Sequence, residues 1–368
     1  MSLDRRDFIR GGLAAAAGVV LGADSLRAVP PPPPGVRRAM YYETTARKRV
    51  ICRLCPNECV LREGERGVCR VRENRDGRLV TLVYGTPCSA HVDPIEKKPL
   101  FHFHPGSTSF SIATAGCNMS CRFCQNWEIS QQGPEKVRSV NLPPAAIVRL
   151  ARERRCTSVA HTYSEPVVFY EYMLDCAREG RRAGIPNVMI SNGYINEAPM
   201  RKLCASLGAV KIDLKAFTDG FYREICGASL APVLKTLEVV KDEGVWLEIV
   251  VLLIPGLNDS AGEVRAMTRW IAEKLGPRVP LHFSRFFPTY RLRNIPPTPP
   301  ATLERSRRIA REAGLEYVYV GNLMSESRHT RCPACGAELI SREGFSARVT
   351  GLKGNHCRNC GHEIPGVF

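Results

Sequence analysis

The 368-residue chain has 44% hydrophobic and 24% charged residues, a composition typical of a soluble globular protein that excludes overall disorder. Its formal net charge of +16 counts every cysteine as neutral, whereas cysteines bind metals as negative thiolates. We therefore do not expect this charge to reflect nucleic-acid binding. The 16 cysteines come mostly in C-x₂-C pairs within a large chain, which favours metal binding over disulfides.

The N-terminus has the pattern of an export signal. Arg5-Arg6 precede the Ala- and Gly-rich stretch 11–23, which is too short for a comfortable membrane span and is typical of a twin-arginine signal. We predict a signal over 1–28 and a Pro-rich basic linker over 29–49, and therefore a periplasmic or other extracytoplasmic protein. The alternative is a disordered basic leader on a cytoplasmic protein, and cleavage of the signal is left open.

The segment 50–106 is rich in cysteine. Cys52, Cys55, Cys59 and Cys69 are close enough in sequence to form one compact metal site. Zinc and an auxiliary 4Fe–4S cluster both accept four cysteines, so the ligand count does not separate them. We expect a structural role for this auxiliary site, with buried thiols that carry no metal as the alternative.

From 107 to 325 the pattern alternates between strand and helix. The predicted strands are Ser109–Ala115, Ser158–His161, Asn187–Ser191, Val210–Leu214, Leu247–Ile254, Leu281–Phe286 and Tyr317–Val320. The predicted helices include Pro144–Arg155, Val167–Arg182, Glu197–Leu207, Ala231–Glu243 and Glu263–Lys274. Repeated βα units with apolar strands indicate a parallel sheet covered by helices. About six units are too few for a closed eight-fold barrel, so we predict an α/β fold with a partial, open (β/α)₆ barrel and its chemistry at the C-terminal strand ends.

Directly after the first predicted strand, Cys117, Cys121 and Cys124 form the motif C-x₃-C-x₂-C. A loop at this place can hold three irons of a 4Fe–4S cluster, which leaves the fourth iron for a chelator from outside the protein. The alternatives are a ferredoxin-like cluster, which would want a fourth cysteine nearby, and a chance group of buried thiols.

The last segment, 326–368, contains two C-x₂-C-G turns and little apolar sequence. Its four cysteines are Cys332, Cys335, Cys357 and Cys360. This spacing predicts a zinc-ribbon-like segment whose metal supplies the folding energy that a small core cannot. We favour a stabilising clip over a docking module or a lid at the barrel mouth.

Five cysteines remain outside these groups, and each is isolated among apolar residues. We interpret them as small buried hydrophobic residues and not as reactive thiols. They are Cys88, Cys156, Cys176, Cys204 and Cys226.

Several blocks of the sequence resemble the radical S-adenosylmethionine (SAM) protein of the AmmeMemoRadiSam system, a family related to the activating enzymes of pyruvate formate-lyase. The resemblance covers nearly all of the chain after the signal. It rests on the runs DPIEKKPL at 93–100, CQNWEIS at 124–130, TYSEP at 162–166, DLKAF at 213–217, IPGLND at 254–259 and HFSRF at 282–286.

The resemblance implies which residues bind the cofactor. Glu165 corresponds to the acidic residue that receives the amino group of SAM, although Glu165-Pro166 also has the pattern of a helix cap. Ser191 and Asn192, at the end of the third predicted strand, should approach the methionine or the ribose.

Three further residues are expected in the barrel interior. Asp213 and Lys215 are two positions apart on a strand and so share one face, which makes them SAM ligands or, alternatively, a structural ion pair. His282 follows the same alternation with a weaker claim, because a lone histidine is more often a core residue.

The resemblance also implies an activity. Such an enzyme receives one electron from a low-potential donor, splits SAM reductively into methionine and a 5′-deoxyadenosyl radical, and abstracts hydrogen from a substrate. The substrate, either a small molecule or a protein, is not identified by the sequence, and partner proteins of the AmmeMemoRadiSam system are a further expectation. The alternatives are a glycyl-radical-enzyme activase and a non-catalytic multi-cluster electron-transfer or metal protein.

Overall fold

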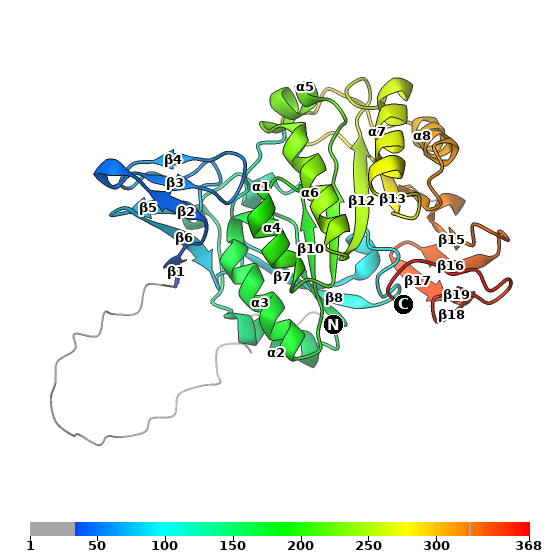
Figure 1. Cartoon of the computed structure of the whole chain (residues 1–368), viewed down its shortest axis with the longest axis horizontal. Coiled ribbons are helices and arrows are strands. Elements are labelled where there is room, and N and C mark those ends of the chain that lie inside the picture. Colours follow the sequence, from blue (N-terminus) through cyan, green and yellow to red (C-terminus); the bar gives the residue numbers. More distant parts are fainter. Residues whose placement is uncertain (1–33, 324) are drawn as a thin grey trace, which may run out of the picture. The chain divides into compact units, whose positions relative to one another are not determined.

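An eight-stranded sheet organises the chain (Figure 1). The computed structural model describes residues 34–323 and 325–368, so the predicted signal and the first part of the predicted linker lie outside the described residues. Seven strands, β8 to β14, run parallel in sequence order, and β7 pairs antiparallel with β8 at one edge. The strands are β7 (Ser89–Pro94), β8 (Thr108–Ala113), β9 (Ser158–His161), β10 (Asn187–Ser191), β11 (Ala209–Asp213), β12 (Trp246–Leu253), β13 (Leu281–Arg285) and β14 (Val318–Gly321).

Helices connect the parallel strands and pack on one face of the sheet. They are α1 (Trp127–Ser130), α2 (Pro144–Glu153), α3 (Tyr170–Arg182), α4 (Glu197–Cys204), α5 (Asp219–Phe221), α6 (Leu230–Asp242), α7 (Ala261–Lys274) and α8 (Pro300–Glu312). Six βα units from β8 to α8 are thus followed by a last strand, β14. Within the described residues β7 and β14 are unpaired edges, so the barrel is open, and the predicted fold class is confirmed.

Local sequence explains where these helices begin. Proline stands at the first position of α2 and of α8, where its missing N–H costs nothing and its fixed φ suits the helix. Ser260 caps α7 because its hydroxyl accepts a hydrogen bond from the backbone N–H of Glu263 at 3.2 Å. The Glu263 side chain accepts from the backbone N–H of Phe217 at 2.6 Å and so ties α7 to the end of the neighbouring strand β11.

Apolar residues fill both faces of the sheet. The larger core lies between the sheet and the helices, and it includes Phe110, Val159 and Ile249 from alternating strand positions. On the inner face a smaller group closes the bottom of the barrel, where Ile95 and Phe103 contact residues of β9, β10 and β11.

The N-terminal part of the described chain forms two small antiparallel sheets. One has the order β1 (Gly35–Arg38), β6 (Arg78–Tyr84), β5 (Arg72–Arg75), and the other has the order β2 (Tyr42–Thr44), β3 (Val50–Cys52), β4 (Val60–Leu61). A buried ion pair fastens this region to α3, because both carboxylate oxygens of Glu171 accept from Arg72 Nη1 at 3.0 and 3.1 Å. Strand β7, although inside the predicted segment 50–106, belongs to the large sheet.

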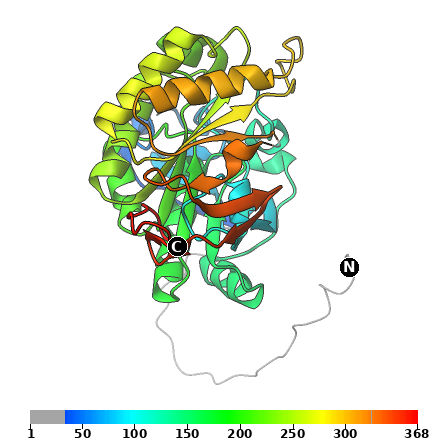
Figure 2. The same ribbon diagram turned by 90° about the vertical axis from the view of Figure 1, so that its right-hand side faces the viewer.

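The C-terminal part consists of short antiparallel strands beside the barrel bottom (Figure 2). They are β15 (Thr330–Arg331), β16 (Glu338–Glu343), β17 (Ser346–Val349), β18 (Leu352–Lys353) and β19 (His356–Cys357). Arg342 on β16 is buried, donates to the carbonyl of Phe101 at 2.7 Å and lies 4.0 Å from the centre of its ring. Phe103 also bridges to Val367, so this part helps to close the barrel bottom.

No helix within 34–323 or 325–368 is long and apolar enough to cross a membrane.

Candidate functional site

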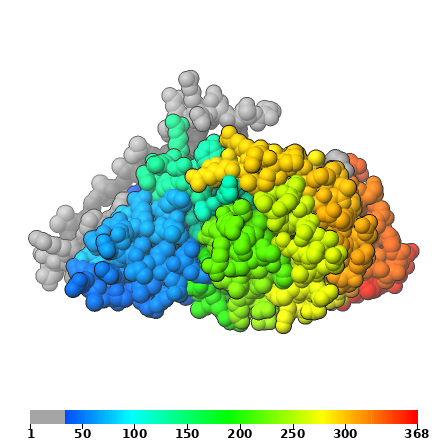
Figure 3. All heavy atoms as spheres, turned by 90° about the horizontal axis from the view of Figure 1, so that it is seen from above, coloured from blue at the N-terminus to red at the C-terminus, as the bar shows by residue number. Residues whose placement is uncertain are grey.

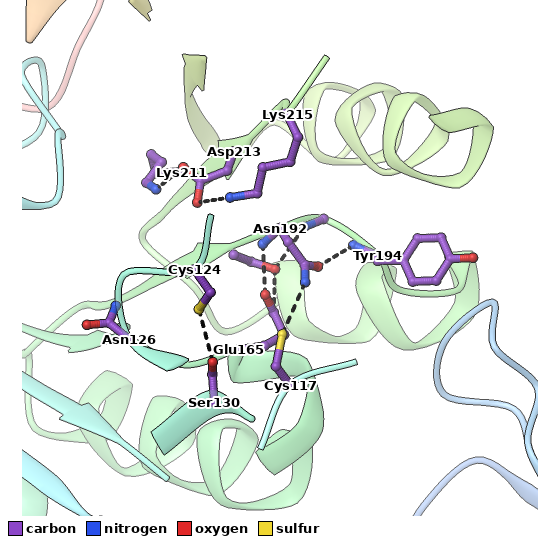
Figure 4. Close-up of polar contacts among 12 residues, drawn as sticks. Cys117, Cys124, Asn126, Ser130, Glu165, Asn192, Tyr194, Lys211, Asp213 and Lys215 are labelled. Carbon is purple, nitrogen blue, oxygen red and sulfur yellow. Dashed lines mark hydrogen bonds and ion pairs between the residues drawn. The ribbon is translucent and has the colours of Figure 1, made fainter. Parts of the chain in front are cut away.

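The three central cysteines lie on the loop that follows β8, at the end of the sheet where the parallel strands terminate. Figure 4 shows Cys117 and Cys124 of this loop beside Glu165, Asn192 and Asp213, which follow or end the next strands. Parallel strands end at one edge of the sheet, so residues far apart in sequence meet there. The structure thus brings together the residues that the sequence predicted, with the exception of His282.

The sulfur of Cys117 is enclosed by hydrogen-bond donors. The backbone N–H of Met119 lies 3.4 Å from it and the side-chain amide of Asn192 lies 3.8 Å from it. Burial raises the pKa of the Cys117 thiol well above its usual value, and the nearby carboxylate of Glu165 raises it further. A thiolate at this place therefore needs a positive partner such as a metal.

The other two cysteines have different surroundings. Cys124 Sγ lies 3.1 Å from the hydroxyl of Ser130, and burial raises the pKa of the Cys124 thiol. The pKa of the Cys121 thiol is lowered by its interaction with the neighbouring Cys226 thiol and by the ammonium of Lys215.

Glu165 is buried behind the cysteine loop and accepts three hydrogen bonds. Its Oε1 accepts from the backbone N–H of Val167 at 3.0 Å and from the hydroxyl of Ser191 at 2.6 Å, and its Oε2 accepts from the backbone N–H of Asn192 at 2.8 Å. The helix-capping role is therefore present. Burial raises the pKa of Glu165 to about 7 despite these bonds. Since a carboxylate has about four acceptor positions, an ammonium can still bind beside the cap.

Ser191 and Asn192 make their contacts within the protein. The Ser191 hydroxyl accepts from the backbone N–H of Gly193 at 3.0 Å while it donates to Glu165. The Asn192 amide group donates to Asn118 Oδ1 at 3.0 Å, and its oxygen accepts from the backbone N–H of Tyr194 at 2.8 Å. Both residues thus fix the acid and the cysteine loop, and their contact with SAM stays a prediction.

Asp213 lies between two lysines. Lys215 Nζ is 3.0 Å from Asp213 Oδ2, and Lys211 Nζ bonds to Asp213 Oδ1 (Figure 4). Burial alone would raise the pKa of Asp213, but the two ammonium groups lower it to about 2. The ion-pair alternative is thus realised with a third member, and Lys215 also lies near Cys121.

His282 lies near the N-terminal end of β13, away from this group. Its Nε2 is 2.7 Å from Glu248 Oε2, and burial lowers the pKa of the imidazole, which stays neutral and donates to the carboxylate. Glu248 also accepts from the backbone N–H groups of Phe101 and His102. His282 therefore helps to anchor the barrel bottom, and the structure offers no contact that supports its predicted role with SAM.

The cysteine loop fits an iron–sulfur cluster. Two of its three sulfurs have a hydrogen-bonding neighbour: Cys117 faces the Met119 N–H and the Asn192 amide, and Cys124 faces the Ser130 hydroxyl. Such contacts accompany cysteine ligands of iron–sulfur clusters and tune them.

Comparison with known proteins agrees with this geometry. The profile of the Radical SAM superfamily matches residues 111–268. The uncharacterized protein MJ0808 of Methanocaldococcus jannaschii is 44% identical over 336 residues, which cover 90% of this chain and all of that protein. The chain belongs to the radical SAM superfamily.

Two more distant similarities involve activating enzymes. The isethionate sulfite-lyase activating enzyme of Oleidesulfovibrio alaskensis is 29% identical over 111 residues, which cover 30% of this radical SAM chain and 36% of that enzyme. A solved domain of a pyruvate-formate lyase-activating enzyme from Bacteroides vulgatus aligns with a TM-score of 0.39 at 17% identity, covering 45% of this chain and 99% of the domain.

Outside the matched radical SAM residues, the chain carries a second cysteine group near its C-terminus. The sulfurs of Cys332, Cys335, Cys357 and Cys360 all lie within 4.8 Å of one another, with Cys332–Cys360 at 3.6 Å and Cys335–Cys357 at 3.7 Å. A tetrahedral zinc with Zn–S bonds of about 2.3 Å would place its sulfurs about 3.8 Å apart. The four residues therefore fit a metal such as zinc.

The N-terminal cysteines lie close together around a small cavity. Cys52, Cys55, Cys59 and Cys69 line it, and Asn118 of the central loop lies at its edge. Burial raises the pKa of Cys55 to about 12 and that of Cys69 to about 11. Thiols so reluctant to ionise become ligands when a metal takes the place of the proton, so the auxiliary metal site stays a prediction that this arrangement fits.

Three residues of the site were not singled out from the sequence. Lys211 could have been found, because it continues the alternation of Asp213 and Lys215. Asn118, inside the cysteine motif, gave no signal of its own. Cys226 was interpreted as an isolated hydrophobic residue, but it lies against the central loop, and only the fold brings the two together.

The rim of the site contains an aromatic stack. Trp127, just after the cysteine loop, stacks on Tyr290 with ring centres 5.2 Å apart, and the backbone N–H of Arg291 donates to the carbonyl of Arg122 at 3.0 Å. Figure 3 shows the segment around 290 beside the segment that follows the cysteine loop.

Proposed function

We propose that the protein is an enzyme that cleaves SAM reductively and uses the resulting radical to abstract hydrogen from a substrate. The observation that carries this proposal is the cysteine loop itself, which places one buried and two half-buried thiols at the C-terminal strand ends, with donor groups beside Cys117 and the Ser130 hydroxyl beside Cys124. A 4Fe–4S cluster on these thiols would supply the electron that divides SAM into methionine and a 5′-deoxyadenosyl radical.

The residues of the protein would then bind and orient the cluster and SAM. Cys117, Cys121 and Cys124 provide three ligands, and Glu165 offers Oε2 to the SAM ammonium. Asn192 supports both functions, because its backbone N–H binds Glu165 and its side chain faces the Cys117 sulfur. Lys215, near Cys121, adds positive charge beside a loop that gains negative charge on reduction.

Anaerobic reconstitution with iron and sulfide, followed by SAM and a strong reductant, tests the proposal. We expect 5′-deoxyadenosine and methionine from the wild type and neither product from Cys117→Ala. A wild type that incorporates a full cluster but forms no 5′-deoxyadenosine would favour an electron-transfer or metal-carrier protein instead.

The second candidate is a glycyl-radical-enzyme activase. It is favoured by the similarity to the isethionate sulfite-lyase activating enzyme. An activase would leave a stable glycyl radical on a protein that copurifies with it, which electron paramagnetic resonance (EPR) detects. Hydrogen transfer from a small molecule into 5′-deoxyadenosine would argue against it.

The partners and the location of the protein belong to the same proposal. A low-potential electron donor is required, and the blocks that resemble the AmmeMemoRadiSam system favour partner proteins of that system. The twin-arginine pattern favours export with the cofactors in place. Fractionation of cells that express the full chain, with a variant in which Arg5 and Arg6 are replaced by lysine, tests the location.

A further inference from the structure

Lys98 is a buried lysine on the inner face of the barrel. Its side chain is 1% exposed, and its Nζ donates to Asp93 Oδ2 at 2.6 Å. Asp93 belongs to the edge strand β7, and its register partner on β8 is Ser109. Since Phe110 of β8 packs in the core between the sheet and the helices, Ser109 and Asp93 point to the opposite, inner side. The Lys98 ammonium therefore lies inside the barrel.

Tyr163 connects this ion pair to the strand ends. Its hydroxyl donates to Asp93 Oδ2, and the centre of its ring lies 4.7 Å from Lys98 Nζ. Its backbone carbonyl accepts from the side-chain amide of Asn126, just after Cys124, at 2.8 Å. Its φ of 65° lies in the left-handed region, which is unusual for a bulky residue and persists only where the surroundings hold it. The phenol thus reaches from the end of β9, beside the cysteine loop, to the ion pair inside the barrel.

A second buried ammonium stands on strand β11. The Lys211 side chain is 6% exposed, and its Nζ donates to Asp213 Oδ1 (Figure 4). Ala209, two positions before it, packs in the inner-face group at the barrel bottom together with Ile95, which lies on the turn that leads to Lys98. Because alternate residues of a strand share one face, Lys211 points to the same side as Ala209. The two ammonium groups therefore stand above one apolar floor.

These two ammonium groups have more N–H donors than acceptors. An ammonium has three N–H groups, and within residues 34–323 and 325–368 the structure gives Lys98 Nζ one hydrogen bond and Lys211 Nζ one. The register partner of Lys211 on β12 is Glu248, whose oxygens accept from Trp246 and His282 at the barrel bottom. Burial lowers the pKa of Lys98 to about 8, and the positive charge of Lys211 acts in the same direction. Buried donors of like charge are costly unless a negative acceptor joins them.

We propose that an anionic group of the substrate, a carboxylate or a phosphate, binds between Lys98 and Lys211 inside the barrel. This inference rests on the proposed function, since it assigns the anion to the radical reaction. Either group has several acceptor oxygens and a negative charge, so it accepts from both lysines while it offsets their repulsion. With the anion held there, the rest of the substrate extends past Tyr163 toward the strand ends, where the cysteine loop and Glu165 lie.

The matched control is Lys97, which binds the same carboxylate as Lys98. Lys97 Nζ donates to Asp93 Oδ1 at 2.8 Å, but its side chain is 46% exposed. Lys98→Met, Lys211→Met and Lys97→Met each replace one ammonium by an uncharged side chain of similar length. The first two changes leave each aspartate with a second ammonium, from Lys97 or from Lys215, so neither of them isolates a buried carboxylate.

The experiment titrates sodium phosphate and, separately, sodium acetate into the full-length wild type and these three variants at constant ionic strength. Isothermal titration calorimetry follows binding with and without SAM. We expect one saturable site in the wild type, for phosphate or for acetate, and the preferred anion identifies the group. Its dissociation constant should rise about tenfold to a hundredfold in Lys98→Met and Lys211→Met, the effect of one charge-assisted hydrogen bond. Lys97→Met should leave it unchanged.

Several outcomes would overturn the inference. They are a wild type that binds neither anion, unchanged binding in Lys98→Met or Lys211→Met, and a loss in Lys97→Met as large as that in Lys98→Met. Displacement of the anion by SAM would assign the two lysines to SAM and would equally contradict a substrate site. Because the titration requires no SAM cleavage, a wild type that forms 5′-deoxyadenosine but binds neither anion overturns this inference alone. A wild type that binds an anion but forms no 5′-deoxyadenosine overturns the proposed function and, with it, the assignment of the anion to a substrate.

Discussion

The C-terminal cysteines and the central cysteines differ in where their sulfur atoms find partners. Cys332 and Cys360, like Cys335 and Cys357, have each other as partners at 3.6 and 3.7 Å. The central cysteines have other protein groups as partners, and the loop that carries them packs on the large core. The C-terminal cysteines are thus arranged so that a metal can cross-link the chain. The central cysteines are instead positioned by the fold, which can bind a metal there and adjust its properties.

Removing a central ligand should have the largest effect. We expect Cys117→Ala, Cys121→Ala or Cys124→Ala to abolish the SAM-responsive cluster signal and all 5′-deoxyadenosine formation, while the melting temperature of the cluster-free protein falls by no more than about 4 °C. The large core does not depend on the cluster, which is why the fold survives. EPR and a thermal melt measure the two effects. A variant with all three cysteines replaced by alanine that still cleaves SAM would contradict the role of this loop as the cluster site.

Removing a C-terminal cysteine should have the opposite result, because it should disturb folding more than the chemistry of the central site. Cys357→Ala should release zinc and unfold the segment from about residue 329 onward, because a structural zinc contributes on the order of 10–16 kcal/mol to such a fold. Hydrogen exchange should then also increase at 101–104, which hydrogen-bonds to this segment. Metal analysis with hydrogen–deuterium exchange tests this prediction.

Cys204→Ala, at a buried cysteine on α4, is the matched control and should keep the zinc. Iron in place of zinc in wild-type protein reconstituted with both metals, or a C-terminal segment that stays protected without any metal, would contradict the structural role.

The smallest effect is expected from replacing Glu165, which has both a predicted role in SAM binding and a structural role as a cap. Glu165→Gln should weaken SAM binding roughly tenfold to a hundredfold, since a charge-assisted bond contributes about 1.5–3 kcal/mol. Because Glu165 also caps the segment after β9, the variant should lose about 1 kcal/mol of stability. SAM titration into the reconstituted cluster and a thermal melt separate the two effects, and an unchanged dissociation constant would assign Glu165 to structure alone.

The raised pKa of Glu165 also predicts how SAM affinity should depend on pH. With a pKa of about 7 in SAM-free protein, the carboxyl is protonated below pH 7, so SAM affinity should fall as the pH decreases from 8 to 6. Glu165→Gln should remove this dependence. The same shift acts on stability with the opposite sign: the folded state binds this proton more tightly than the unfolded state, so the contribution of Glu165 to stability is lost as pH rises from its usual pKa of about 4.5 through 7.

The sequence predicted the parallel sheet well because the strands are continuous apolar runs that end at polar residues. Strands β9 and β10 begin and end where the pattern places them. Strand β7 was missed, since its middle residues His91 and Val92 are exposed and the strand gives no buried run. Its antiparallel pairing with β8 depends on a contact that local sequence does not encode.

The candidate site shows the same distinction between features that local sequence encodes and features that depend on tertiary contacts. Loop and strand-end residues such as Cys117, Glu165 and Asp213 could be found because a parallel sheet gathers its strand ends. His282 follows the inward alternation but stands near the start of its strand beside Glu248, so its contact with SAM stays a prediction that period alone supports. Cys226 meets Cys121 only through tertiary pairing, and spacing cannot reveal that contact.

Asn118 joins the N-terminal cysteine segment to the central loop. Its backbone carbonyl accepts from Asn57 Nδ2 at 2.8 Å, its side-chain Nδ2 donates to the backbone carbonyl of Tyr194 at 2.6 Å, and its side-chain oxygen accepts from Asn192. A metal at the predicted N-terminal site would order the cysteines around Asn57 and would so lower the entropy that the central loop has to lose if a cluster assembles on it. By thermodynamic linkage such a coupling would be reciprocal, and an assembled cluster would raise the affinity of the N-terminal cysteines for a metal by the same factor.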